Sequence, residues 1–284
     1  MKKRLLQVLL SLLFLGSSGL SSVSAQTIRM ASYNIRYDNP GDSGNLWKDR
    51  SPYLVALVRY HDFDLFGTQE GLEHQLQLMQ DSLRDYDRFG AGRDDGRQAG
   101  EHSAIFYKRS VFELLRSGNF WLSATPDTPS MGWDAKCCKR ICSWVELRHR
   151  KSGKRFFCFN AHFDHEGVVA REESSKLILQ RIRSIAGDAA VIFCGDLNGS
   201  RSSGWYQTVI RSGWLRDSYS DVQFPYANNT SFNGWGRALK GNEVIDHIFV
   251  NNAFRAVQWG ILTDTYFGKF PSDHFPVLAL LQFR

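Results

Sequence analysis

Two polar residues, Asp196 and Asn198, follow an apolar run of strand type that ends on Gly195. Residues two positions apart on an extended chain point the same way, so both side chains can address one point beyond the strand. A carboxylate that takes a proton and an amide that donates to an oxyanion suit attack on phosphorus or on carbonyl carbon. A buried strand followed by a turn fits the same residues, since Gly, Asp and Asn favour turns.

Other polar residues also stand at or just beyond apolar runs. Taken singly, each is explained most simply as a cap or a turn residue. Taken together, two Asp-His dipeptides, one Gly-Asp-x-Asn and one Glu at a strand end are hard to assign to caps alone. The set comprises Asn34, Glu70, Glu101, His162, Asp164, Asp196, Asn198, Asp246, His247, Asp273 and His274.

The elements that position these residues can be read from the apolar pattern. Strands are expected at 27–35, 64–70, 103–107, 112–118, 140–147, 155–162, 191–195, 244–250 and 277–283. Helical spacing predicts helices over 72–83, 169–185 and 204–212, and Ser51 before Pro52 predicts a helix start there. Residues 121–139 form a long irregular segment, a length typical of binding loops. Alternating strands and helices with hairpins predict an α/β layered fold with mixed sheets.

The first 25 residues have the pattern of a signal peptide. Lys2, Lys3 and Arg4 precede an apolar run over 5–15, and Val23-Ser24-Ala25 resembles a cleavage site. The run is too short to span a bilayer comfortably. We therefore expect one mature domain over 26–284, exported to the periplasm or the medium, monomeric and without stable membrane insertion. The formal net charge of +6 includes three leader residues, so it favours anionic partners only weakly.

The chain contains five cysteines. Cys158 and Cys194 lie inside apolar runs and are expected to be small buried side chains. Cys137, Cys138 and Cys142 cluster, and one local disulfide could form among them. No histidine completes a tetrahedral zinc spacing there, and no catalytic role is assigned to these cysteines.

With these segments in place, the chain resembles the endonuclease/exonuclease/phosphatase superfamily, the metal-dependent phosphoesterases that include deoxyribonuclease I. The similarity covers nearly the whole mature chain and is nearest to secreted bacterial and deadenylase-like branches. It implies a deoxyribonuclease I-like, four-layer α+β sandwich of two packed mixed β-sheets flanked by helices. The matching segments, in the family's order, are residues 32–36, 67–70, 100–107, 160–165, 195–198, 245–250 and 272–277.

The resemblance also implies a metal site and a water-activating acid. Glu70 would be the principal ligand of a divalent cation, with Asn34 beside it and Asp273 contributing directly or through water. Such oxygen ligands suit Mg²⁺ or Mn²⁺ rather than Zn²⁺. Asp196 would orient and deprotonate the attacking water, and Asn198 would hold a phosphate oxygen.

Two histidines and an arginine complete the implied machinery. His274, oriented by Asp246, would stabilise the phosphate oxygens, and His162, paired with Glu101, would contact the phosphate or the leaving oxygen. Arg140 would bind phosphate through its guanidinium fork.

Some neighbouring residues leave more than one interpretation. Asp164 is expected to contact substrate. Phe232 and Asn233, in the loop 230–235, belong either to an apolar tuck beneath the fold or to a stacking platform for substrate. His247 should point away from the site, because side chains alternate along a strand.

Together these features predict a divalent-metal-dependent phosphoesterase that cleaves a P–O bond by direct attack of an activated water. We expect a phosphodiesterase or nuclease, with a phosphate ester, nucleic acid included, as its partner. The first alternative is a phosphomonoesterase or diesterase acting on inositol phosphates, sugar phosphates or phospholipid head groups. A second alternative is a non-catalytic binding module on the same scaffold, against which the intact set of polar residues counts.

Overall fold

The structure is a computed structural model that describes residues 27–227 and 229–284, so the expected leader lies outside the described residues. The described chain folds into two six-stranded mixed sheets. The first has the order β11-β12-β1-β2-β4-β3, with β1 at Thr27–Asn34, β2 at Leu65–Gln69, β3 at Tyr86–Phe89, β4 at Ile105–Lys108, β11 at Phe254–Ile261 and β12 at Val277–Phe283. The second has the order β5-β6-β7-β8-β10-β9, with β5 at Phe112–Trp121, β6 at Ile141–His149, β7 at Arg155–His162, β8 at Ala190–Asp196, β9 at Arg216–Asp217 and β10 at Asp246–Val250.

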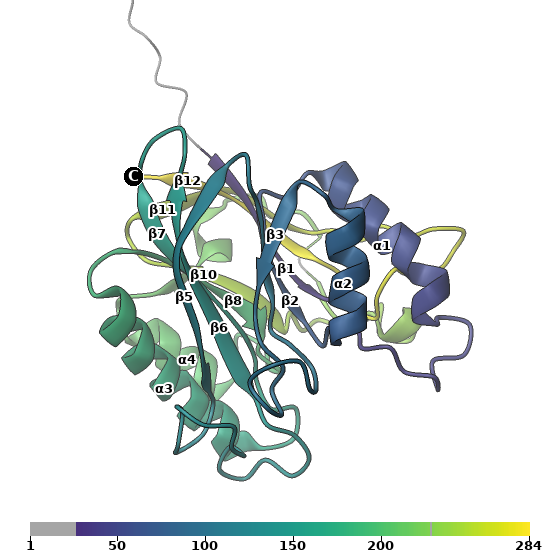
Figure 1. The fold of residues 1–284 in the computed structure, drawn as a ribbon, viewed down its shortest axis with the longest axis horizontal. Helices are drawn as coiled ribbons and strands as arrows, with labels where there is room; N and C mark the ends of the chain where they lie inside the picture. Colours follow the sequence, from purple (N-terminus) through teal and green to yellow (C-terminus); the bar gives the residue numbers. More distant parts are fainter. Residues whose placement is uncertain (1–26, 228) are drawn as a thin grey trace, which may run out of the picture.

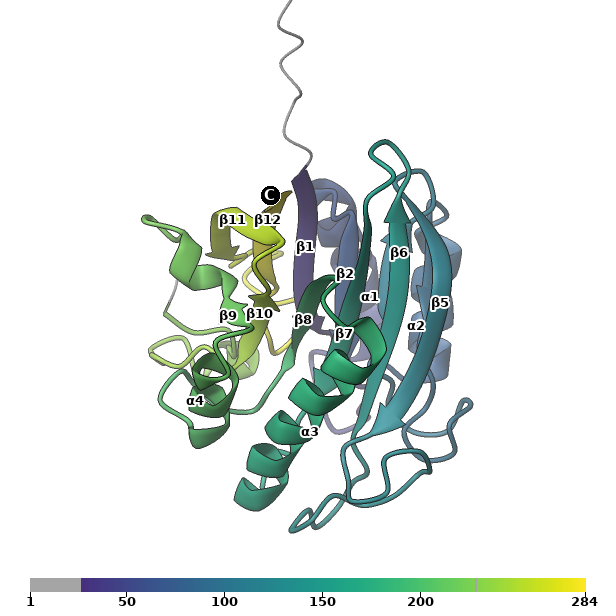
Figure 2. The same cartoon turned by 90° about the vertical axis from the view of Figure 1, so that its left-hand side faces the viewer.

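Helices cover the outer face of each sheet (Figures 1 and 2). The helices α1 (Trp47–His61) and α2 (Glu73–Ser82) pack on the first sheet, and α3 (Val168–Ala186) and α4 (Gly204–Arg211) pack on the second. Two short 3-10 helices, η1 (Ser218–Asp221) and η2 (Gly234–Gly236), lie in the connections. The predicted four-layer sandwich is confirmed. Among the described residues, no helix combines the length and the apolar character needed to cross a membrane.

The alternation of side chains along the strands decides which residues reach the site. In β8, Ile192 and Cys194 pack between the sheets, whereas Val191 and Phe193 pack beneath α3 and α4. Asp196 continues the inward series, because residues two apart share a face. The same parity places Asn34 of β1, His162 of β7 and Asp246 of β10 at the inner edge of the sandwich.

Strand register then brings the inward residues to one level. His162 is the register partner of Asp196 in the parallel pair β7–β8, and Asp246 is its partner in the antiparallel pair β8–β10. A buried polar bridge joins the two sheets nearby, where Gln69 Nε2 donates to Asn160 Oδ1 at 2.7 Å. Neighbouring strands therefore present their catalytic-type side chains side by side.

Two features of the sequence prediction need correction. The helix α1 begins at Trp47, not at Ser51, and Pro52 lies inside it. The cause is a tertiary anchor, since buried Arg50 donates to the carbonyls of Ile35 at 2.7 Å and Pro271 at 3.0 Å. The strands β3, β9 and β11 were not predicted, and β11 carries a register shift between Ala256 and Gln258 that breaks its period of two.

Gly195 allows β7 and β8 to approach closely just before Asp196. A Cβ added there would lie 1.9 Å from the carbonyl oxygen of Ala161, a backbone atom that cannot swing aside. We expect Gly195→Ala to lower the free energy of unfolding by about 3 kcal/mol or more, as overpacking against backbone does. Urea unfolding at 25 °C measures this change.

Gly153→Ala is the matched control for that measurement. Gly153 has a φ of +71° but meets nothing within 4 Å, so alanine there adds only backbone strain of about 1 kcal/mol. Equal losses in the two variants would show that the contact with Ala161 does not constrain the fold.

Candidate active site

A cavity of about 640 Å³ opens at the edge of the sandwich where these strands end. Most of the predicted site residues line it, although they come from distant parts of the chain. Those that line it are Glu70, Glu101, Arg140, His162, Asp196, Asn198, Phe232, Asp273 and His274.

Asp196 lies at the centre of the polar groups. Its Oδ2 accepts a hydrogen bond from Asn34 Nδ2 at 2.9 Å and lies 3.5 Å from His162 Nε2 and 3.7 Å from His274 Nε2. Burial, reinforced by the nearby Asp246 carboxylate, raises the pKa of Asp196 to about 7. A carboxylate with a pKa near neutrality is well matched to removing a proton from water.

His274 and Asp246 form a buried ion pair. His274 Nδ1 lies 2.9 Å from Asp246 Oδ2, which leaves Nε2 directed toward Asp196. Burial alone would lower the pKa of His274, but the carboxylates of Asp246 and Asp196 outweigh it and raise the pKa to about 10. The imidazole is therefore cationic at neutral pH and can stabilise negative charge on a substrate oxygen.

This pair gives a pH-dependent prediction. Because Asp246 raises the pKa of His274, Asp246→Asn should lower it, and His274 should lose its proton at a lower pH. We expect the alkaline limb of the kcat/KM profile to move down by about 1 to 3 pH units, the usual effect of removing a close opposite charge. Steady-state rates from pH 6 to 11 measure the shift. Asp264→Asn, which removes the partner of His61 outside the cavity, should leave the limb in place.

His162 differs from His274 in its charge state. Burial, followed by the positive charges of Arg140 and Arg93, holds the pKa of His162 well below its usual range, so this imidazole is neutral. Its Nδ1 lies 3.9 Å from Glu101 Oε2 and makes no hydrogen bond within the described part of the chain. Glu101 instead accepts from Arg93 Nη1 at 2.6 Å. The expected Glu101–His162 pair is therefore a loose contact.

Arg140 is held on the cavity wall by two neighbours. Its Nε lies 3.4 Å from Asp164 Oδ2 and its Nη2 lies 2.7 Å from His165 Nδ1. Only 4% of Arg140 is exposed, and its Nη1 has no hydrogen-bond partner in the described structure. A buried guanidinium with free N–H groups suits an anionic oxygen of a ligand.

Asp164 and Asn233, predicted to contact substrate, lie one layer behind the cavity. Asp164 Oδ1 accepts from the backbone N–H groups of Glu166 and Gly167 at 2.9 and 2.6 Å, so the carboxylate shapes the loop and holds Arg140. The side chain of Asn233 bonds the backbone of Ser272 and Trp235. Both side chains are hydrogen-bonded to backbone groups, which the sequence pattern could not reveal.

The loop 230–235 fits both interpretations, the apolar tuck beneath the fold and the platform beside the substrate. Asn233 tucks beneath the fold, whereas Phe232 is 37% exposed on the cavity wall, with its ring centroid 5.1 Å from that of His274. Asn198 also has two roles, because it lies in a turn and lines the cavity. Its N–H donates to Asp196 Oδ1 at 3.0 Å, and its side-chain amide donates to the carbonyl of Phe163 at 3.0 Å.

Comparison with known proteins agrees with this geometry. A sequence model described as the endonuclease/exonuclease/phosphatase family matches residues 31–274. The chain belongs to the endonuclease/exonuclease/phosphatase family. Its members are phosphoesterases, nucleases and phosphatases among them, and they generally depend on divalent metals.

Two solved structures from Bacteroides thetaiotaomicron are similar to this family member over nearly its whole length. One, described as an endonuclease/exonuclease/phosphatase family protein, is 43% identical, with a TM-score of 0.88 over 91% of this chain and 98% of the other. The second, a mannosyl-6-phosphatase, is 43% identical, with a TM-score of 0.87 over 90% of this chain and 100% of the other. An RNA exonuclease of Saccharomyces cerevisiae is 27% identical over 49% of this chain and 48% of its own length.

The residues present in this family member fit a divalent cation. Glu70, His162 and Asp196 each offer a ligand atom, and these atoms lie within 4.8 Å of one another. Asn34 Nδ2 donates to Glu70 Oε1 at 2.9 Å. Burial raises the pKa of Asp273, with the Glu70 carboxylate adding to the effect, so negative charge is crowded here and a cation would relieve it.

The backbone at Glu70 supports the same conclusion. Glu70 has a φ of +65°, a left-handed conformation that costs a residue with a Cβ about 1 to 3 kcal/mol and is common at functional sites. In this position Glu70 Oε2 accepts from the N–H of Tyr37 at 3.1 Å. A second cluster, Asp196, Asp246 and His274, suits a cation less well, because a protonated imidazole has no lone pair to offer.

Several cavity residues of this family member were not predicted from the sequence. Arg36 lies between two carboxylates, with Nε 3.7 Å from Asp273 Oδ2 and Nη1 3.8 Å from Glu70 Oε2. Arg36 belongs to the family segment 32–36, as Asn34 does, and this position could have identified it as a site residue. Ile245, which begins the family segment 245–250, also lines the cavity. Tyr37, Cys137 and Cys138 line it too, and they lie outside the family segments.

Proposed function

We propose that this protein is a divalent-metal-dependent phosphatase that hydrolyses a phosphate monoester of a sugar. The observation that carries the proposal is the site itself: the phosphoesterase residues lie in a walled cavity of about 640 Å³, a volume typical of small-molecule sites. The 43% identity to a mannosyl-6-phosphatase, across 90% of this chain, supports a sugar phosphate.

The residues of the site suit hydrolysis by a single displacement at phosphorus. The water oxygen attacks phosphorus, Asp196 takes a water proton, and the P–O bond to the sugar breaks as its oxygen leaves with the bonding electrons. Cationic His274, the free N–H of Arg140 and the Asn198 amide stabilise charge on the phosphoryl oxygens, while neutral His162 contacts a phosphoryl or leaving oxygen. A divalent cation held by Glu70, with Asn34, Asp273, His162 and the Asp196 carboxylate close by, would neutralise the phosphate charge.

A substrate panel tests the proposal. Hydrolysis with Mg²⁺ or Mn²⁺ would be compared across two groups of esters. Phosphate release measures the hydrolysis of hexose 6-phosphates, inositol phosphates and p-nitrophenyl phosphate. Release of p-nitrophenol or of shorter fragments measures the hydrolysis of bis-p-nitrophenyl phosphate, single-stranded RNA and duplex DNA. We expect the highest kcat/KM on a hexose 6-phosphate and full loss of activity with EDTA, restored by Mg²⁺ or Mn²⁺. Turnover confined to diesters or nucleic acid would replace the phosphatase with the nuclease-type enzyme, the second candidate, which the similarity to an RNA exonuclease favours. No hydrolysis of any ester would favour a binding module.

We also propose that the protein is exported and acts as a monomer. The basic head, apolar run and small-residue site of the first 25 residues support export. The disulfide between Cys137 and Cys138 fits an oxidising compartment. Fractionation of the producing cells and light scattering of the mature chain test the two statements.

A further inference from the structure

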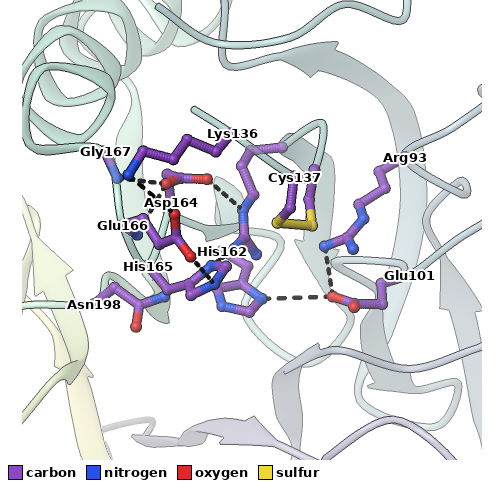
Figure 3. The surroundings of a disulfide bond; sticks show 12 residues. Arg93, Glu101, Lys136, Cys137, His162, Asp164, His165, Glu166, Gly167 and Asn198 are labelled. Atoms are coloured by element: carbon purple, nitrogen blue, oxygen red, sulfur yellow. Dashed lines mark hydrogen bonds and ion pairs between the residues drawn. A yellow bond between two sulfur atoms is a disulfide. The ribbon is translucent and has the colours of Figure 1, made fainter. Parts of the chain in front are cut away.

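A disulfide joins the adjacent residues Cys137 and Cys138, and both line the cavity (Figure 3). Cys142, the third cysteine of the segment, is instead buried and free. A disulfide stabilises a fold mainly by closing a long loop of the unfolded chain, and a bond between neighbours closes almost none. The apolar clusters of the described chain do not include either residue. Stability therefore does not account for this bond.

The segment that carries the disulfide is fixed on both sides. Before it, Asp134 accepts hydrogen bonds from the N–H groups of Val169 and Ala170 at the start of α3, at 3.1 and 2.6 Å. After it, Lys139 Nζ donates to the carbonyl of Asp94 at 2.8 Å. The disulfide is thus held at a set place on the cavity wall beside Arg140, whose Nη1 is buried and without a hydrogen-bond partner in the described structure.

The position of the disulfide suits contact with the part of a substrate beyond the phosphate. Asp196 lies between His162 and His274. Phe232 packs against His274 on the cavity wall, and the surroundings of the disulfide, which lines the same cavity, include His162 (Figure 3). The cavity that holds the phosphate machinery is therefore also lined by the Phe232 ring and the disulfide, surfaces against which the remainder of an ester can lie.

The chemistry of the disulfide matches one face of a sugar ring. Two bonded sulfur atoms present a compact, polarizable, weakly hydrated surface. A pyranose ring has C–H faces that gain from contact with such a surface, and hydroxyls at its rim that need hydrogen bonds. Arg93 and His165 line the same cavity and can hydrogen-bond to these hydroxyls.

We propose that the Cys137–Cys138 disulfide is the wall against which the sugar ring packs, and that it determines a preference for cyclic sugar phosphates over open-chain phosphate esters. This inference rests on the proposed function and deepens it. Its test is the kcat/KM ratio between a hexose 6-phosphate and glycerol 3-phosphate, which has the phosphate but no ring. For the variant Cys137→Ser/Cys138→Ser we expect that ratio to fall about tenfold, mainly through a higher KM for the hexose ester, as loss of an apolar contact in a pocket does.

Two further arms keep the test decisive if the double variant folds poorly. Wild-type enzyme treated with TCEP should show the same fall in the ratio, because reduction opens the bond without changing the sequence. TCEP should not change the ratio of the double variant. Met131→Ser, which alters an exposed side chain of the same loop outside the cavity lining, should keep the wild-type ratio.

The possible failures are distinguishable. If wild-type enzyme does not hydrolyse hexose 6-phosphates, the proposed function fails and this inference fails with it. If wild type hydrolyses them and both the double variant and the reduced enzyme keep the wild-type ratio, the proposed function stands and the disulfide wall is wrong.

Discussion

Asp196→Asn is expected to lower kcat by a factor of about 10³ to 10⁴ while leaving the fold intact, since general-base catalysis contributes at this scale. Asparagine keeps the size of the side chain but cannot take a proton from water. Asp196 Oδ2 lies 3.5 Å from His162 Nε2 and 3.7 Å from His274 Nε2, so its carboxylate occupies the point where both site histidines converge. Phosphate release from a hexose 6-phosphate at saturating Mg²⁺ measures the loss.

The control for this variant is Asp188→Asn, which removes a carboxylate whose side chain is 99% exposed on the surface. It should keep wild-type kcat, and both variants should unfold at wild-type urea concentrations within experimental error. If folded Asp196→Asn retains more than a tenth of the wild-type kcat, Asp196 is not the base that takes the proton from water.

Glu70→Gln is expected to raise the Mg²⁺ or Mn²⁺ concentration needed for half-maximal activity by about 100-fold or more. This exceeds the loss of metal affinity usual for residues that only hydrogen-bond to a metal ligand. The variant is nearly isosteric and can still accept the N–H of Tyr37, which Glu70 Oε2 binds at 3.1 Å. Its neutral amide is a much weaker ligand for a hard divalent cation. Mn²⁺ binding followed by electron paramagnetic resonance gives a readout that does not depend on turnover.

Glu113→Gln on β5 is the corresponding surface control and should bind Mn²⁺ as the wild type does. If Glu70→Gln loses activity but keeps wild-type Mn²⁺ affinity, Glu70 acts on the substrate or the water and is not a metal ligand. Such a result would leave the assignment of Asp196 untouched.

The sequence was informative where a repeating pattern or a family segment carried the signal. The alternation along 244–250 predicted that His247 faces away, and His247 is indeed buried outside the cavity, with Nδ1 3.2 Å from Asp217 Oδ2. The same alternation, combined with strand register, explains why Asn34, His162, Asp196 and Asp246 meet. The buried positions expected for Cys158 and Cys194 are confirmed.

The features that escaped prediction depend on contacts between distant segments. The start of α1 is set by Arg50 reaching carbonyls at Ile35 and Pro271, and no local signal shows such a bond. The position of Asp164 behind Arg140 depends on how residues 164–167 turn. The choice of Cys138, rather than Cys142, as the partner of Cys137 follows from the placement of Cys142 inside β6, where its side chain is fully buried.

The measurement that tests the central claim most directly is the stereochemical course at phosphorus. Hydrolysis of a hexose 6-thiophosphate, made chiral with two oxygen isotopes, in water labelled with the third isotope, releases a chiral thiophosphate whose configuration shows whether one displacement or two occur. Direct attack by a water that Asp196 activates predicts inversion of configuration in the released thiophosphate. Retention would mean two displacements through a covalent phosphoenzyme, and it would contradict the mechanism proposed for this site.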